Sequence, residues 1–208
     1  MARRERVTAI LSELRGTTWS GEDEVRSRLV DPCLRALGWN IGRTNTEVPL
    51  RLTEEMARLW NYRSRRMRRD YVLRTRTGQA LHVEAKYQWS MPIRQVEVLL
   101  AQISRDEWND TRRDGPKKDL ALLLWGAKSQ NVRRAALIDE SRLLVFDWDD
   151  GWKLVAAEEL FQGSPDRVHE AFQLLERAPR TWQQNIQLDT HLAAIRRNIS
   201  VRLIAKTG

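Results

Sequence analysis

The chain has 208 residues, of which 36 are Lys or Arg and 28 are Asp or Glu, so its formal net charge is +8 at pH 7. This length suffices for one full hydrophobic core, and the charge favours a polyanionic partner, nucleic acid above all, over an anionic membrane surface. The sequence has no run of about 20 apolar residues, which argues against a membrane-spanning helix. It also has no apolar stretch after the charged N-terminus, so we expect a cytoplasmic protein without membrane contact.

Two amphipathic helices are predicted at the start of the chain. Residues 3–15 carry apolar side chains at helical spacing, and Gly16 ends this helix. The second helix begins near Ser20, bends or restarts at Pro32 and ends at Gly38. Three acidic residues, Glu22, Asp23 and Glu24, fall in the first turn of this helix, where the positive end of the helix dipole stabilises negative charge. We prefer this explanation for Glu22 and Asp23.

A short edge strand is predicted at residues 46–50, because Pro49 is tolerated only at the edge or end of a sheet. Residues 51–69 then form a basic insertion, whose second half combines arginines with aromatic residues. Such a composition neutralises phosphates and stacks on bases, although a solvated basic loop has the same composition. We predict that nucleic acid contacts five of the arginines: Arg63, Arg65, Arg66, Arg68 and Arg69.

A hairpin of two strands, residues 69–73 and 81–86, is the most informative stretch of the chain. Both arms are rich in the β-branched, aromatic and aliphatic residues that strands favour. Gly78 stands where a three-residue loop requires a left-handed conformation, so we expect Thr75 to pair with Gln79. Because side chains alternate between the faces of a strand, one face of the hairpin should pack into the core. This apolar face consists of Tyr71, Leu73, Leu81, Val83 and Ala85.

The opposite face of the hairpin carries charged residues. In the register set by the loop, Asp70 lies directly opposite Glu84, and Lys86 projects from the same side. Facing carboxylates repel each other unless a positive charge lies between them, and a divalent cation is the natural candidate. The alternative is an ion cluster on the surface of the sheet. Asp and Glu are poor strand formers, which favours a functional site over that alternative.

These charged residues carry a resemblance to a known family. Asp70, followed on the next strand by Glu84-Ala85-Lys86, matches the Asp…Glu-x-Lys signature of the PD-(D/E)xK nuclease superfamily. The chain resembles in particular the N-terminal nuclease domain of type I restriction enzyme motor subunits, and small stand-alone proteins like it. The match covers roughly residues 21–125. In this chain the pattern reads Glu24-Val25-Arg26, Leu29-Val30-Asp31-Pro32, Leu37-Gly38-Trp39, Asp70-Tyr71-Val72-Leu73 and Glu84-Ala85-Lys86.

The resemblance implies an α/β fold with a restriction-endonuclease-like core, in which helices flank a mixed central β-sheet in the order αβββαβ. It also implies the activity of a Mg²⁺-dependent endodeoxyribonuclease that hydrolyses phosphodiester bonds in a restriction or phage-defence system. Mn²⁺ is expected to substitute for Mg²⁺. The metal would be held by Asp70, Glu84 and the backbone carbonyl of Ala85, while Lys86 would orient the attacking water and offset charge on the scissile phosphate.

Two further site residues follow from the resemblance alone. Glu24 would reach the metal region from the second helix, although the helix dipole also accounts for an acidic residue there. Gln102 matches a glutamine that related nucleases often carry on the helix after the hairpin. That glutamine is followed four residues later by tyrosine in the family, whereas this chain has Asp106.

The rest of the chain continues the α/β pattern. A long helix is predicted at about residues 93–112, and the near-continuous apolar run at 119–126 is typical of a central strand covered on both faces. A terminal hairpin joins residues 143–148 to 152–155 through an Asp-Asp-Gly turn. From residue 164 onward the pattern is helical.

The predicted organisation is a nuclease-like domain at residues 1–163 and a helical C-terminal extension at 164–208. As an alternative to the endonuclease, the chain is a catalytically silent nucleic-acid-binding subunit of a larger complex. The expected partners are DNA and proteins of a restriction or defence complex, and a homodimer is compatible with the sequence.

Overall fold

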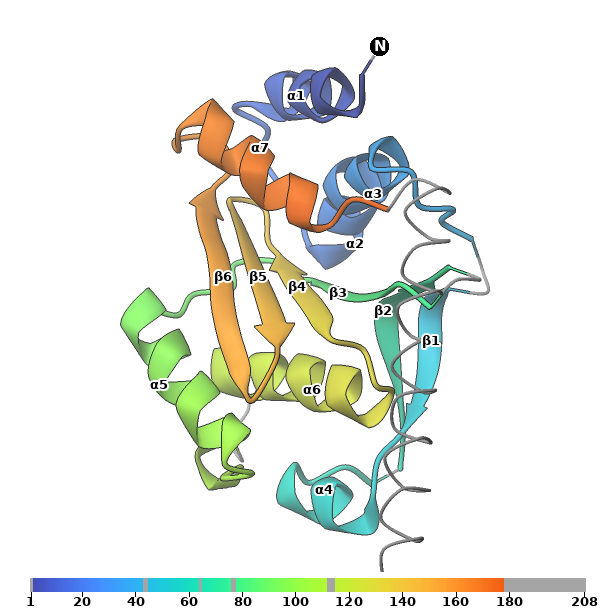
Figure 1. Ribbon diagram of the computed structural model, residues 1–208, viewed down its shortest axis with the longest axis vertical. Helices are drawn as coiled ribbons and strands as arrows, with labels where there is room; N and C mark the ends of the chain where they lie inside the picture. Colours follow the sequence, from blue (N-terminus) through green and yellow to red (C-terminus); the bar gives the residue numbers. More distant parts are fainter. Residues whose placement is uncertain (1, 43–44, 64, 76–77, 112–114, 178–208) are drawn as a thin grey trace, which may run out of the picture. The chain divides into compact units, whose positions relative to one another are not determined.

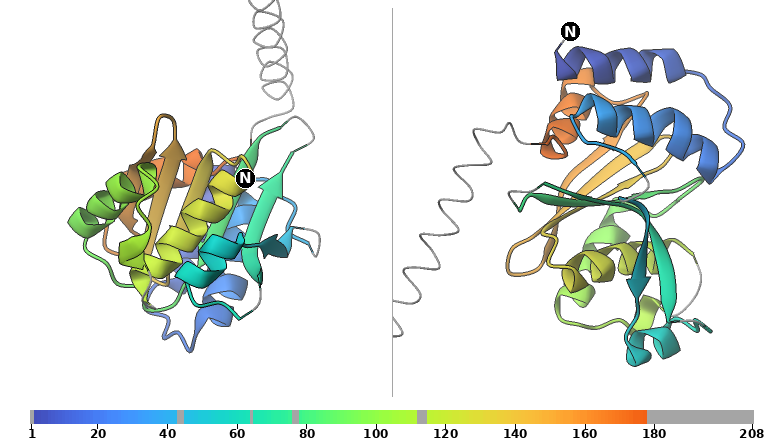
Figure 2. Two further views of the ribbon diagram at one scale, coloured as in Figure 1. Left: turned by 90° about the horizontal axis from the view of Figure 1, so that it is seen from below. Right: turned by 90° about the vertical axis from the view of Figure 1, so that its right-hand side faces the viewer.

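The structure is a computed structural model that describes residues 2–42, 45–63, 65–75, 78–111 and 115–177. The chain divides into two units, Met1–Leu73 with Ala80–Glu176 and Arg74–Gln79 with Arg177–Gly208, and each is described by itself. The first unit is α/β, with a six-stranded mixed sheet between two layers of helices (Figures 1 and 2). Within the described ranges, no helix is both long and apolar enough to cross a membrane.

The strands lie in the sheet in their chain order. β1 pairs antiparallel with β2, β3 pairs parallel with β4, and the pairs β4–β5 and β5–β6 are antiparallel. The predicted edge strand is confirmed, because β1 stands at one end of this order. The strands are β1 (Thr46–Arg51), β2 (Arg66–Arg74), β3 (Ala80–Ala85), β4 (Arg134–Ile138), β5 (Arg142–Trp148) and β6 (Trp152–Glu159).

Helices cover both faces of the sheet (Figure 1). One face is covered by α1 (Arg3–Leu14), α2 (Glu22–Glu24), the π-helical segment η1 (Val25–Val30), α3 (Asp31–Ala36) and α7 (Pro165–Leu174). The other is covered by α4 (Glu54–Leu59), α5 (Ile93–Ser104) and α6 (Pro116–Ser129), with a 3₁₀ turn η2 (Asn109–Thr111) between the last two. Strands β3 and β4 are parallel and therefore need a crossover connection, which contains α5 and α6.

The first two predicted helices are confirmed. The second runs without a break from α2 through η1 to α3, and its i→i+5 turn directly precedes Pro32. Pro32 has no amide hydrogen, so the regular hydrogen-bond ladder cannot continue through it. The amide of Asp31 donates instead to the carbonyl of Arg26. Gly38 follows the helix with a φ of +94°, as expected of a C-terminal glycine.

The core has two parts, one on each face of the sheet. The predicted apolar face of the β2–β3 hairpin is confirmed, because all five of its residues are buried in one cluster with α1, η1, α3 and α7. The other cluster lies under α4, α5 and α6. β4 contributes Ala136 and Ile138 to the first cluster and Ala135 and Leu137 to the second, and residues of β5 likewise enter both clusters, so both strands are buried on both faces.

The predicted central strand at residues 119–126 is wrong, because these residues form part of α6. A continuous apolar run fits a buried helix as well as a buried strand, and Pro116 in the first turn is a helix-start signal. The helix predicted at 93–112 also ends earlier, at Ser104. The terminal hairpin is confirmed as β5 and β6.

Two predicted segments, the basic insertion and the C-terminal extension, contain regular secondary structure. The basic insertion at 51–69 contains α4 and the beginning of β2. The predicted C-terminal extension begins with α7, which packs into the first cluster through Val168, Ala171 and Phe172. Residues 178–208 of that extension lie outside the described residues, and the domain boundary after residue 163 stays a prediction.

In the second unit, the described residues of the hairpin turn confirm the predicted pairing. The amide of Thr75 donates to the carbonyl of Gln79 at 2.9 Å, and the amide of Gly78 donates to the carbonyl of Thr75 at 3.2 Å. Gly78 has a φ of +92°, the left-handed conformation that the loop requires. The other two predicted loop residues, 76 and 77, lie outside the described residues.

Candidate active site at the end of strand β3

The structure brings the three residues of the predicted signature together. Asp70 lies in β2 and accepts a hydrogen bond through Oδ2 from the amide of Ala85 at 2.8 Å. Lys86 directly follows β3, and its Nζ lies 3.2 Å from Oε1 of Glu84. A fourth residue joins them from α2, because Nζ of Lys86 donates to Oε2 of Glu22 at 3.0 Å. The hairpin and the start of the second helix therefore meet at this point.

The pKa of the Asp70 carboxyl group is raised well above its ordinary value. Burial first, and then the negative charge of Glu84, raise its pKa to about 7. The amide of Ala85 and the positive charges of Lys86 and Arg26 act in the opposite direction but are outweighed. Asp70 therefore changes its protonation state near neutral pH.

Glu84 is held between two cations. Oε1 faces Lys86, and Oε2 lies 3.5 Å from Nη1 of Arg69, a distance that marks an ion pair without a hydrogen bond. Oε2 is buried and has no hydrogen-bond partner among the described residues. Burial disfavours the charged form of Lys86, but Glu84, Glu22 and Asp70 outweigh burial and raise the pKa of Lys86. Lys86 is therefore a cation at neutral pH.

The other two predicted catalytic residues are not brought to this cluster. Glu24 accepts hydrogen bonds from the amide and hydroxyl of Ser20 and pairs with Arg28. The hydrogen bond from Arg28, followed by those from Ser20, lowers the pKa of Glu24 to about 2. Gln102 lies on α5 and donates a hydrogen bond to Asp110 at 3.0 Å. Helix α5 packs mainly against β6, which stands at the other end of the strand order from β1 and β2.

Sequence reasoning missed three charged residues at this place. Arg26 in η1 lies 3.7 Å from Oδ1 of Asp70 and 3.6 Å from Oε1 of Glu47. Asp119 in α6 has a raised pKa, chiefly through burial, and it interacts electrostatically with Lys86, Glu84 and Glu22. Asp119 was hidden because its segment was assigned to a strand. Successive helical residues point about 100° apart, so an acidic triplet in a first turn does not reveal that Glu22 faces the site.

Arg69, for which we predicted a contact with nucleic acid, is buried in the structure, which argues against that contact. Its side chain is only 1% exposed, because it points from β2 toward α6. The other four arginines are exposed. Nε of Arg65 donates to the carbonyl of Leu52 at 3.3 Å, and Arg68 pairs with Glu47 at 2.9 Å. In the antiparallel register Arg66 stands opposite Arg51, so exposed arginines line both strands of the β1–β2 ribbon.

The donor set fits a hard divalent cation. Mg²⁺ prefers oxygen ligands and is usually bound through one or two carboxylates together with substrate phosphate and water. Asp70 and Glu84 supply two carboxylates, and the one oxygen of Glu84 that does not face the buried Arg69 is Oε1. No group of three or more His, Cys, Asp or Glu side chains suited to hold a metal occurs in the described ranges. The protein part of such a site is therefore minimal.

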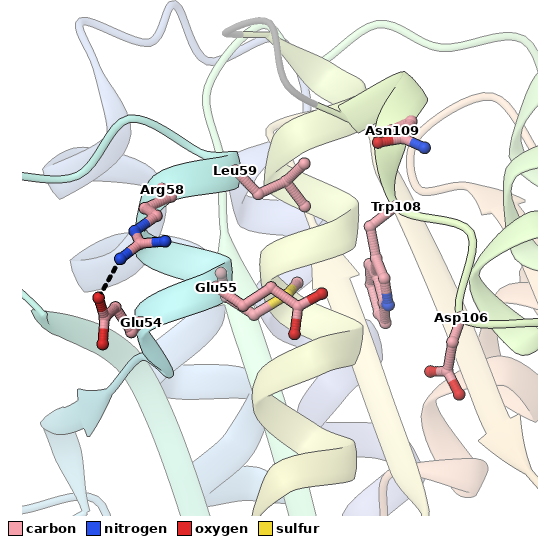
Figure 3. Close-up of a pocket in the computed structure, with 8 residues that line it drawn as sticks. Glu54, Glu55, Arg58, Leu59, Asp106, Trp108 and Asn109 are labelled. Atoms are coloured by element: carbon pink, nitrogen blue, oxygen red, sulfur yellow. Dashed lines mark hydrogen bonds and ion pairs between the residues drawn. The ribbon is translucent and has the colours of Figure 1, made fainter.

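A separate pocket of about 750 Å³ lies between α4 and the segment that follows α5 (Figure 3). Glu55 and Trp108 face each other across it, and Glu54 pairs with Arg58 at its rim. None of the residues of the Asp70 cluster lines this pocket. Its lining residues are Glu54, Glu55, Met56, Arg58, Leu59, Asp106, Trp108 and Asn109.

Comparison of the chain with family models, with curated proteins and with solved structures gave no match.

Proposed function

We propose that the protein is a metal-dependent DNA endonuclease with a restriction-endonuclease-like core, acting in the cytoplasm in a restriction or phage-defence system. The observation that carries this proposal is the partly buried Asp70 beside the buried Glu84, at a position where Lys86 follows the strand. The order of elements supports the proposed core, since α3, β1, β2, β3, α6 and β4 follow the expected order of a helix, three strands, a helix and a strand, with α4 inserted between β1 and β2 and α5 and η2 inserted before α6.

In this proposal, Asp70, Glu84 and the carbonyl of Ala85 would hold Mg²⁺, or Mn²⁺ in its place. The chemistry that such a cation supplies when bound is stabilisation of charge on the scissile phosphate and a lowered pKa of water. The pKa of about 7 for Asp70 supports this role, because metal binding requires the deprotonated carboxylate and relieves its repulsion from Glu84.

Lys86 has a separate part in the proposed reaction. Its raised pKa keeps a proton on Nζ, so Lys86 acts as a hydrogen-bond donor and a positive charge, and a general base in that state is excluded. We assign it to offset the charge that develops on the phosphate and to orient the attacking water. Glu22 competes for the same ammonium group at 3.0 Å and holds it in place before substrate arrives.

The exposed arginines of the β1–β2 ribbon would bind the DNA backbone. Guanidinium groups recognise phosphate oxygens through paired hydrogen bonds, and the net charge of +8 favours a polyanion. Arg66 and Arg68 lie on the same strand as Asp70, so a backbone bound along this strand is led toward the carboxylates. Protein partners of a restriction complex would supply sequence recognition or translocation.

Cleavage of supercoiled plasmid and single-stranded circles in Mg²⁺, Mn²⁺ and EDTA tests the endonuclease. We expect metal-dependent cutting by the wild type, none in EDTA, and none by Lys86→Ala. Lys153→Ala is the matched control, because Lys153 is an exposed lysine paired with Asp149 on the distant terminal hairpin. Full activity of Lys86→Ala, or cutting that persists in EDTA, would remove the assignment.

The second candidate function is a catalytically silent nucleic-acid-binding subunit. It is favoured by the double engagement of Lys86 with Glu22 and Glu84. This function predicts salt-sensitive DNA binding with no turnover in either metal, equally in wild type and Lys86→Ala.

A further inference from the structure

A buried arginine lies directly behind the candidate site. Arg69 is 1% exposed and is one of the largest fully buried side chains of the described chain. Its Nη1 faces Oε2 of Glu84 at 3.5 Å. Its Nη2 donates to the carbonyl of Leu122 in α6 and lies 3.4 Å from the sulfur of Met67. The guanidinium therefore joins the helix layer to the carboxylate of β3.

Helix α6 is shaped to accept this guanidinium. A Cβ atom on Gly126 would lie 3.1 Å from Nε of Arg69, and 3.0 Å from His82 and from Leu50. Glycine is disfavoured inside helices, so its place in α6 is explained by the close approach of these three side chains. Leu122 and Gly126 are four residues apart and lie on one face of the helix. The guanidinium of Arg69 therefore packs directly against the backbone of α6 at Leu122 and Gly126.

The two oxygens of Glu84 have different surroundings as a result. Oε2 faces a guanidinium that is fixed by the helix and excluded from water. Oε1 faces Lys86, whose side chain is more exposed, at 16% against 1% for Arg69. A buried cation held in one geometry orients its counter-ion strongly, because neither charge can turn to solvent. Oε1 of Glu84 is thus the oxygen on the side of Lys86.

We propose that Arg69 is a positioning residue for Glu84: it anchors Oε2, leaves Oε1 for the divalent cation, and adds a fixed positive charge that limits metal affinity. This inference rests on the proposed endonuclease function. Arg69 touches neither metal nor phosphate and acts only through Glu84. Its loss should therefore move metal binding and turnover in opposite directions.

The test measures Mn²⁺ binding to the full chain by calorimetry and, separately, the plasmid cleavage rate at saturating Mn²⁺. For Arg69→Met we expect Mn²⁺ to bind about 3- to 10-fold more tightly, because a positive charge near the cation is removed. The cleavage rate should fall by about 10- to 100-fold, because the carboxylate is no longer held in one orientation. For Arg69→Lys, which keeps the charge, Mn²⁺ affinity should stay within about twofold of wild type, with part of the cleavage rate restored.

Two further variants keep the test decisive if Arg69→Met does not fold. Gly126→Ala retains the charge but displaces the guanidinium by a few tenths of an ångström, so we expect wild-type Mn²⁺ affinity with a several-fold lower rate. Arg134→Met is the matched control, since Arg134 likewise joins a carboxylate, Asp147, to a helix carbonyl, that of Leu174, away from the site. It should change neither measurement in the folded protein.

The inference is overturned if Arg69→Met and Gly126→Ala lower Mn²⁺ affinity and cleavage rate in parallel, or if they change neither. Both results apply only where the wild type binds Mn²⁺ and cuts DNA, and they leave the endonuclease proposal intact. A wild type that neither binds Mn²⁺ nor cuts removes the proposed function and this inference with it.

Discussion

Within the described residues, two groups of carboxylates near the ends of strands β3 and β4 are built in opposite ways. At the end of β4, Asp139 is 1% exposed, and its Oδ1 accepts hydrogen bonds from the amide and hydroxyl of Ser141 and from the amide of Arg142, at 2.7 to 2.9 Å. Its Oδ2 meets the Arg142 guanidinium at 3.2 Å. At the end of β3, Asp70 has one amide donor and a like charge beside it, and Glu84 has a buried oxygen without a hydrogen bond within the described residues.

The difference separates a structural carboxylate from a candidate functional one. Asp139 gains donors on both oxygens, so burial of its charge supports the β4–β5 turn. Folding removes Asp70 and Glu84 from water and brings their like charges together. Both effects lower the stability of the folded protein unless a bound ligand offsets them. Burial alone does not mark a site, whereas the burial of like charges beside unsatisfied acceptors does.

The largest expected effect is the loss of cutting in Asp70→Asn. This change removes one metal-binding carboxylate, and we expect the cleavage rate in Mg²⁺ to fall by at least about 10²–10³-fold. The melting temperature should not fall, since the asparagine relieves repulsion from Glu84. Asp139→Asn is the matched control, and it should keep its cleavage rate per folded molecule. Equal losses of activity in the two variants would end the distinction between these carboxylates.

Stability should depend on pH through Asp70. Folding raises its pKa from 3.8 to about 7, so the native state holds this proton more tightly than the unfolded chain does. The free energy of unfolding contributed by Asp70 should therefore fall as pH rises from about 4 to about 7, by a few kcal/mol, and then level off. Urea unfolding at pH 5, 6, 7 and 8 measures this slope, and Asp70→Asn should flatten it. Saturating Mg²⁺ should flatten it as well, because the cation binds the ionised form.

Removal of the Asp139 carboxylate should lower stability without affecting metal binding. The loss should be similar to, or smaller than, the pH effect expected for Asp70. Asp139→Ala leaves the Ser141 and Arg142 donors without their acceptor, and we expect the free energy of unfolding to fall by about 2–4 kcal/mol. The loss should be nearly the same with and without Mn²⁺, since Asp139 is not in the candidate metal site. A Mn²⁺-dependent loss would mean that the two carboxylate clusters are coupled.

Local rules predicted the hairpin of the site well. The position of Gly78 fixed the pairing of Thr75 with Gln79, and the alternation of side chains separated the buried face from Asp70, Glu84 and Lys86. These features depend on residues close together in the chain. The terminal hairpin followed from the same rules.

Tertiary contacts decided what the sequence left open. Residues 119–126 were assigned to a strand because an apolar run has no period that distinguishes a buried helix, and Asp119 was missed with it. Glu22 and Glu24 lie two residues apart in the same helix turn, and only the path of the helix past β3 brings Glu22 to Lys86. Arg69 stood in a run of arginines, and its burial follows from the approach of α6 at Gly126.

The smallest expected effect concerns the exposed arginines, as opposed to the buried Arg69. Replacing Arg65, Arg66 and Arg68 together by glutamine should reduce the salt dependence of duplex DNA binding, because each lost phosphate contact lowers the log–log slope by about 0.9. The matched control replaces Arg105, Arg133 and Arg167, which are also exposed but lie outside β1 and β2, and it should leave the slope within about 0.5 of wild type. Binding titrations between 50 and 200 mM salt, roughly the range over which such slopes are resolved, decide between the two surfaces. A larger change in the control would move the DNA-binding surface away from the β1–β2 ribbon, and with it the path by which DNA reaches Asp70.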